Sequence, residues 1–171
     1  MFQIISLILI AALVGLDRVS KIAVIHVFKG GESKDILFGL FRLRYTENTG
    51  AAFSAFSDST AVLSVFTVLV LILCLFVLLT RKAKSRFISA CLILIIAGGT
   101  GNVIDRIAKG FVVDFIEPLF MNFAVFNVAD IFVTVGAGLL IIYEIRELIL
   151  EKKKGKQENK ETEDDGKDKL I

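Results

Sequence analysis

The sequence predicts an all-α integral membrane protein with four transmembrane helices, and three observations carry this prediction. Hydrophobic residues make up 55% of the 171 residues and the mean hydropathy is +0.74, whereas a soluble domain has about 45–50% apolar residues. The apolar residues gather in four runs without charge, at 2–16, 61–79, 87–98 and 131–143. The second run alone reaches the roughly 20 residues that a spanning helix needs, and the other three runs are shorter.

We therefore expect helices over residues 4–25, 60–80, 87–108 and 124–148. The first, third and fourth reach spanning length only by including polar residues, namely Asp17, Asn102, Asp105, Asn127 and Asp130. An Asp at the centre of a spanning helix costs about 2.5–3.5 kcal/mol on insertion scales. Each acid should therefore have a partner or a function.

The segments between the helices predict a small β-rich lobe. Residues 36–45 partly alternate apolar with polar or small side chains, which is typical of a half-buried strand, and residues 111–116 look extended after a break at Lys109-Gly110. We expect an outer lobe over about 28–59 that rests on the membrane surface. Residues 151–171 contain seven lysines and seven acids, which predicts a disordered tail behind a membrane domain of residues 1–150.

The placement of positive charge predicts the orientation. Lys and Arg gather in the link 81–86 and again at 152–156. The positive-inside rule makes both segments cytoplasmic, with both chain termini inside and residues 28–59 and 107–122 outside. The first apolar run lacks a basic segment before it, so we expect a retained helix and not a cleaved signal peptide.

Composition also excludes several classes of function. A net charge of +2 is too small to suggest a nucleic-acid partner. Cys74 and Cys91 both fall in spans, where a packing role is expected and no disulfide or metal framework is implied. The only histidine is His26, without an HExxH motif, so zinc hydrolysis and His-activated nucleophiles are disfavoured and no metal or cofactor is expected.

A set of polar residues predicts an active site near the outer face. Its members are acids, amides and one arginine that the topology places at one depth: Asp17, Asn48, Asn102, Arg106, Asp114, Asn127 and Asp130. Each alone has a structural interpretation. Asp17 and Lys21, four residues apart, form a helix-fixing ion pair, and Asp105 with Arg106 beside several glycines is typical of close helix packing. Together, at one depth in the membrane, the seven residues predict a catalytic site.

The chemistry open to these residues is acid–base catalysis by two carboxyl groups. Close approach of two carboxylates splits their pKa values, so that one activates water while the other donates a proton. Asp114 and Asp130 suit this role because neither has a neighbouring cation in sequence, whereas Asp17 has Lys21 and Asp105 has Arg106. A proton- or cation-coupled transporter is the alternative, since intramembrane acids also mark ion pathways. A structural scaffold would leave Asp130 unexplained.

Five short segments follow one another along the chain: residues 17–21 (DRVSK), 48–53 (NTGAAF), 101–106 (GNVIDR), 112–115 (VVDF) and 126–130 (FNVAD). In this order they resemble the successive motifs of one family, the signal peptidase II (lipoprotein signal peptidase) family. The resemblance implies a monomeric aspartyl endopeptidase of the bacterial cytoplasmic membrane. It would cut lipid-modified prolipoproteins just before the diacylglyceryl cysteine, with membrane lipid as its other partner and sensitivity to the antibiotic globomycin.

The resemblance also assigns roles to residues. Asp114 and Asp130 would be the catalytic pair. The residues that would bind substrate or support the site are Asp17, Lys21, Asn48, Gly50, Asn102, Arg106, Asn127 and Ala129. Asp105 is expected to be structural, and the outer segment 28–59 to cover the substrate. The sequence departs from the family where Ser20 replaces the usual Thr and Arg18 replaces a common Gln.

Overall fold

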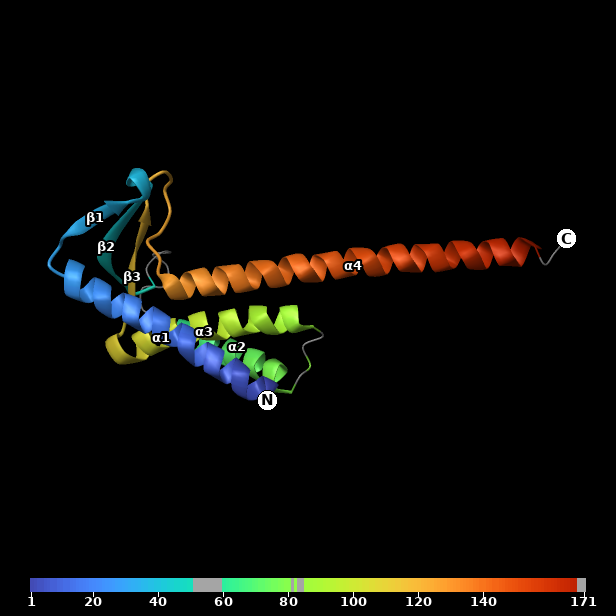
Figure 1. Cartoon of the computed structure of the whole chain (residues 1–171), viewed down its shortest axis with the longest axis horizontal. Coiled ribbons are helices and arrows are strands. Elements are labelled where there is room, and N and C mark those ends of the chain that lie inside the picture. Colours follow the sequence, from blue (N-terminus) through green and yellow to red (C-terminus); the bar gives the residue numbers. More distant parts are fainter. Residues whose placement is uncertain (51–59, 81, 83–84, 169–171) are drawn as a thin grey trace. The chain divides into compact units, whose positions relative to one another are not determined.

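The computed structural model describes residues 1–50, 60–80, 82 and 85–168, and it has four long helices (Figure 1). They are α1 (Phe2–Phe28), α2 (Thr60–Leu79), α3 (Arg86–Lys109) and α4 (Val128–Asp168). Each is long and apolar enough to cross a membrane, so the four predicted helices are confirmed as candidate spans by length and composition. Residues 1–137 form one compact unit and residues 138–171 a second, so the chain divides inside α4. The expected domain boundary at residue 150 stays a prediction.

The ends of α3 follow local capping rules. Ser85 precedes the helix, and its Oγ accepts a hydrogen bond of 3.1 Å from the backbone N–H of Ile88. At the other end Gly110 adopts φ = +81°, and its N–H donates to the carbonyl of Arg106 over 3.0 Å. A left-handed glycine is a common helix stop, so the predicted break at Lys109-Gly110 is confirmed.

The fourth helix differs from its prediction at both ends. It begins at Val128 and not at 124, because Phe126 is extended and exchanges backbone hydrogen bonds of 2.8 and 3.0 Å with Ile116. It continues to Asp168, where a disordered tail was predicted from residue 151. Lys, Glu and Gln dominate this tail; they cannot bury a core, but they are good helix formers.

Three short strands form the predicted lobe. Strands β1 (Ser33–Ile36), β2 (Phe41–Asn48) and β3 (Val112–Pro118) make an antiparallel sheet in the order β1-β2-β3. The one-turn helix η1 (Leu37–Gly39) links β1 to β2. The part of the lobe at 51–59, with Ala51-Ala52-Phe53 of the second motif, lies outside the described residues. Arg81 and Lys84 of the basic link do too.

An apolar cluster joins the sheet to the bundle. Val24 and Phe28, in the last two turns of α1, pack with Phe115 of β3 as buried residues. Leu43, Tyr45, Ile116 and Val128 pack around them while partly buried. This contact fixes the sheet, and the side chains it carries, against the end of α1.

Glycines on α3 let its neighbours approach closely, as their pattern predicted. A Cβ on Gly98 would collide with the backbone oxygen of Ala129 and lie 2.8 Å from Val133, both on α4. A Cβ on Gly99 would lie 2.6 Å from the side chain of Leu71 on α2. Small residues at such positions allow backbone-to-backbone contact between spanning helices. The same approach brings the start of α4 to the polar residues of α3.

Candidate active site

A buried lysine lies at the centre of the polar residues. Lys21, on α1, is fully buried, and its Nζ lies 3.0 Å from Asp17 Oδ2, 2.9 Å from Asp105 Oδ2 and 3.0 Å from Asn102 Oδ1. The contact with Asn102 is a hydrogen bond, and the contacts with the two carboxylates are ion pairs that balance the charge of the ammonium group. The predicted Asp17–Lys21 pair is confirmed. The other oxygen of Asp17 accepts a hydrogen bond of 3.1 Å from the backbone N–H of Ala129.

The partner predicted for Asp105 was wrong. Its carboxylate is fully buried and pairs with Arg18 over 2.6 Å, with Lys21 over 2.9 Å and with Lys109 over 3.1 Å. Arg106, the neighbour in sequence, is not among the cations that pair with it in the described residues, because adjacent residues on a helix point in different directions. Arg18, whose role the sequence left open, supplies one of the three cations.

Arg106 is therefore not brought to the other site residues within the part of the chain that the structure describes. It lines a separate apolar groove with Ser64, Val65 and Val68 of α2. Its Nε is buried and has no hydrogen-bond partner in that part of the chain. Its expected contact with substrate stays a prediction.

The start of α4 holds Asp130 by a reciprocal pair of hydrogen bonds. Asn127 precedes the helix, and its Oδ1 accepts from the backbone N–H of Asp130, while Asp130 Oδ2 accepts from the N–H of Asn127, both over 3.0 Å. This is a capping box, which satisfies two N–H groups that a helix start otherwise leaves free. Asp130 Oδ1 also accepts a bond of 2.7 Å from Asn102 Nδ2.

The sheet holds Asp114 by two amide groups. Asn48 Nδ2, from β2, donates to Asp114 Oδ2 over 2.8 Å, and Asn127 Nδ2 donates to Asp114 Oδ1 over 2.7 Å. In the sheet Asn48 faces Val112 and lies diagonal to Asp114, two residues further along β3. Asp114 is only 2% exposed.

Each of the three amides is oriented by a group that can only donate. The oxygen of Asn102 accepts from Lys21 Nζ, that of Asn127 from the backbone N–H of Asp130, and that of Asn48 from the N–H of Gly50 over 2.8 Å. With the oxygen so occupied, the NH₂ group of each amide must turn the other way, towards a carboxylate. Gly50 adopts φ = +90°, which a residue with a side chain rarely takes.

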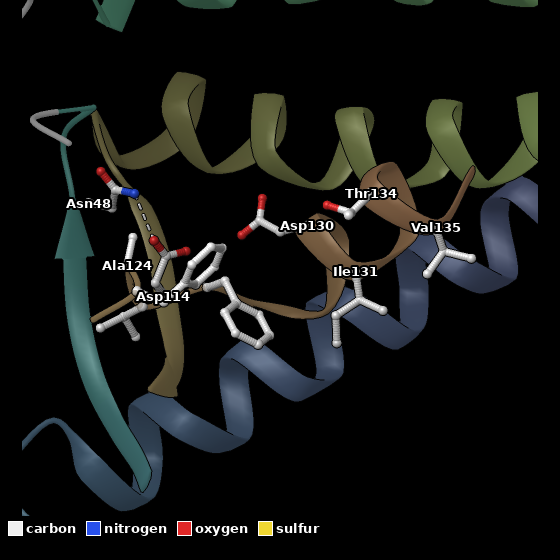
Figure 2. A pocket seen from close by; sticks show the side chains of 10 residues that line it. Asn48, Asp114, Ala124, Asp130, Ile131, Thr134 and Val135 are labelled. Atoms are coloured by element: carbon white, nitrogen blue, oxygen red, sulfur yellow. Dashed lines mark hydrogen bonds between the residues drawn. The ribbon is translucent and has the colours of Figure 1, made fainter. Parts of the chain in front are cut away.

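Asp114 and Asp130 line one pocket. It has a volume of about 440 Å³, and its other walls come from Asn48, the segment 123–126 and the first turns of α4. Figure 2 shows the carboxyl group of Asp114, on β3, pointing towards that of Asp130, on α4. Neither carboxylate forms an ion pair with any residue that the structure describes. The predicted pair of acids without cations is therefore brought together in space.

Burial changes the chemistry of Asp114. Removal from water raises the pKa of its carboxyl group from 3.8 to about 6, and the nearby Asp130 acts in the same direction. The hydrogen bonds from Asn48 and Asn127 oppose this rise, since they favour the charged form. Asp114 is thus suited to hold a proton close to neutral pH. No group of three or more His, Cys, Asp or Glu side chains in the described residues is arranged to hold a metal ion.

Comparisons with known proteins identify the family. The family model described as Signal peptidase (SPase) II matches residues 9–146. The lipoprotein signal peptidase of Streptococcus pneumoniae is 39% identical over 142 residues, covering 83% of this chain and 93% of that protein. The lipoprotein signal peptidase of Streptococcus pyogenes is 42% identical over 139 residues, covering 81% and 90%.

A solved structure agrees with this result. A bacterial membrane enzyme, determined by the in meso method at 1.9 Å resolution, has a TM-score of 0.74 and 30% identity. The match covers 81% of this chain and 90% of that one. With a family model over most of its length and relatives of about 40% identity, the chain belongs to the signal peptidase II family, the lipoprotein signal peptidases.

Proposed function

We propose that this chain is an aspartyl endopeptidase whose catalytic residues are Asp114 and Asp130. Membership of the family indicates a membrane peptidase that removes signal peptides from prolipoproteins. The proposal of an aspartyl mechanism rests on one observation: the two carboxyl groups face one pocket and have no cation partner among the described residues. Every other acid in the buried cluster is paired with a lysine or an arginine.

The proposed reaction needs one proton shared between the two acids. Asp130, as carboxylate, takes a proton from a water molecule as its oxygen attacks the scissile carbonyl carbon. Asp114, with its raised pKa, donates its proton to the carbonyl oxygen. When the tetrahedral intermediate collapses, Asp130 gives its proton to the leaving amine and Asp114 recovers the one it gave. The products are a carboxylic acid at the end of the signal peptide and a free amine on the cysteine.

The ionic cluster would act behind the catalytic pair. Lys21 binds the oxygen of Asn102, so the NH₂ group of Asn102 is held on Asp130. Asp17 and Asp105 balance the charge of Lys21, while Asn48 and Asn127 hold Asp114. Such fixed donors stabilise the geometry before substrate arrives and need no rearrangement during the reaction.

The walls of the pocket suit a substrate that is anchored in lipid. Ile131 and Val135, both exposed on the first turns of α4, form one wall, and Phe123 contributes to another. A diacylglyceryl group on the substrate cysteine would stay in the bilayer against these side chains, and the adjacent peptide bond would then lie beside the two acids. We propose cleavage directly before that cysteine.

The placement of the site supports an outward-facing active site. The catalytic residues and the sheet lie at the end of α3 opposite Arg86 and the basic link. By the positive-inside rule the link is cytoplasmic, so we propose that the active site faces outwards and both termini lie inside. All the proposed residues come from one chain, which is consistent with a monomer. A transporter would require acids along a route through the membrane, whereas these acids gather at one end.

The function can be tested with a synthetic prolipoprotein presented in vesicles with the purified protein. We expect one product whose new N-terminus is the lipid-modified cysteine, identified by mass spectrometry. The same precursor without the diacylglyceryl group is the matched control and should be cut poorly. Globomycin should block the reaction. Equal cleavage of both precursors, or a cut at another bond, would contradict the proposed substrate.

A further inference from the structure

One end of the sheet presents a cluster of exposed apolar side chains, which we call the apolar tip. Its members come from the β1–β2 turn and from the segment after β3: Leu37, Phe38, Leu40, Phe120 and Met121. The register places the two segments together, because Ile36 faces Phe41 and Phe41 faces Pro118 at this end of the sheet. Phe38 is 105% exposed, as much as it would be in an extended chain.

The apolar tip is built by specific contacts. The backbone N–H of Leu119 donates to the carbonyl of Leu40 over 2.9 Å, which ties the two segments together. The rings of Phe41 and Phe120 meet edge to face, with centroids 5.6 Å apart. Leu37 and Phe38 adopt φ = +49° and +58°, a region that disfavours residues with a side chain. The backbone of the turn is therefore strained in a conformation that leaves Phe38 fully exposed.

Charge is arranged around the apolar tip and not on it. Residues 36–41 and 118–129 contain no Asp, Glu, Lys or Arg. The neighbouring strands, in contrast, carry the paired charges Arg42–Asp35 and Arg44–Glu117, with shortest distances of 2.7 and 2.8 Å. An exposed apolar patch of this kind, bordered by polar residues, is typical of a surface that contacts a membrane or another partner.

The apolar tip continues into surface that belongs to a spanning helix. Phe123 follows Met121 and is 58% exposed, and it lines the same pocket as Ile131 and Val135 of α4. These two residues are exposed and lie in a helix apolar enough to cross a membrane, so we expect this side of α4 to face lipid. In Figure 1 the strands run across the end of the bundle formed by α1 and α3, with η1 at the far end of the sheet. An apolar path thus leads from the lipid-facing side of α4 to η1.

We infer that the apolar tip inserts into the lipid of the adjacent membrane leaflet and anchors the sheet beside the fourth span. The occupant is bilayer lipid, because the apolar path is continuous with a lipid-facing helix and carries no charge that would oppose insertion. Apolar side chains of this kind reach roughly 5–10 Å into the boundary between headgroups and acyl chains. Since β2 and β3 carry Asn48 and Asp114, the anchor would also set the depth of the site.

Fluorescence can test this anchor, because the chain contains no tryptophan. Phe38→Trp introduces a single tryptophan, at the apolar tip. Glu32→Trp, an exposed position at the other end of β1, is the matched control. Each purified variant is placed in vesicles with and without lipids that are brominated on the upper acyl chain, which quench tryptophan on contact. Met121→Trp is a second probe of the tip in case Phe38→Trp alters the turn.

The anchor predicts that both tip probes emit at shorter wavelength than the control and lose at least about twice as much emission to the brominated lipid. The vesicles contain no other protein and no substrate. If a partner protein or a substrate acyl chain were the natural occupant of the apolar tip, the tip probes and the control would therefore be quenched alike. Quenching at the tip equal to that of Glu32→Trp would overturn the inference. This measurement does not depend on peptidase activity, so its failure and that of the proposed function can be told apart.

Discussion

Replacing Asp105 with Asn keeps the shape of the side chain but removes the charge that faces three cations. In the structure the Asp105 carboxylate is fully buried and lies 2.6 Å from Arg18, 2.9 Å from Lys21 and 3.1 Å from Lys109. Without it, Asp17 is the only carboxylate among the described residues that remains in contact with Lys21. We therefore expect Asp105→Asn to destabilise the fold while the catalytic acids remain in place.

The size of this effect follows from burial. Removing one partner of a buried ion pair costs about 3–5 kcal/mol, because the remaining charge is left without compensation. For a chain of 150–250 residues each kcal/mol corresponds to about 2–4 °C in Tm, so the expected decrease is roughly 6–20 °C. Thermal unfolding of the purified protein in detergent, followed by intrinsic Tyr fluorescence or circular dichroism, measures it directly.

Two matched controls make the comparison specific. Asp35→Asn removes the same charge from a pair with Arg42 at 2.7 Å, but both side chains are well exposed, so Tm should hardly change. Arg18→Gln should lower Tm because it removes one partner of Asp105, whereas Arg106→Gln should leave Tm nearly unchanged. If Asp105→Asn had a normal Tm but no activity, Asp105 would belong to the chemistry and this reasoning would be wrong.

Three further predictions concern the site and its packing. The folded-state pKa of Asp114 is raised to about 6, so its protonated form stabilises the fold below about pH 4. This contribution to the free energy of unfolding, about 3 kcal/mol, is lost as the pH rises through 6. Unfolding measured as a function of pH should show this loss in the unaltered protein but not in Asp114→Asn. Gly101→Ala should destabilise by about 1–3 kcal/mol in thermal unfolding, since its Cβ would lie 2.5 Å from Asp17 Oδ2, whereas Gly15→Ala meets no atom and should be neutral or stabilising. Asn48→Ala should lower cleavage about 10- to 100-fold with little loss of Tm, because it removes one of the two amides on Asp114; unchanged cleavage would contradict that role.

The sequence was sufficient for what depends on local pattern. Runs of apolar residues predicted four spans, and the Lys109-Gly110 break predicted the end of α3. Sorting acids by neighbouring cations separated Asp114 and Asp130 from Asp17. The start of α4 was missed although its signal was present: the three-residue spacing of Asn127 and Asp130 is that of a capping box, which would have moved the helix start to 128.

Contacts between distant segments could not be predicted. Arg18 and Asp105 are 87 residues apart, and only the packing of α1 against α3 brings them together. The nearest cation in sequence, on Arg106, was chosen for Asp105 because adjacency was the only criterion available. Likewise, β3 joins a sheet whose other strands lie some 70 residues earlier, so neither its register nor the bond from Asn48 to Asp114 follows from local pattern.

The most direct test of the account is cleavage of a diacylglyceryl-modified precursor by Asp114→Asn and Asp130→Asn. Each substitution keeps the size of the side chain but prevents it from exchanging a proton with water or substrate. We expect each to lower the rate at least about 100-fold, while thermal unfolding shows that the protein remains folded. Full activity in either variant would contradict the assignment of Asp114 and Asp130 as the catalytic pair.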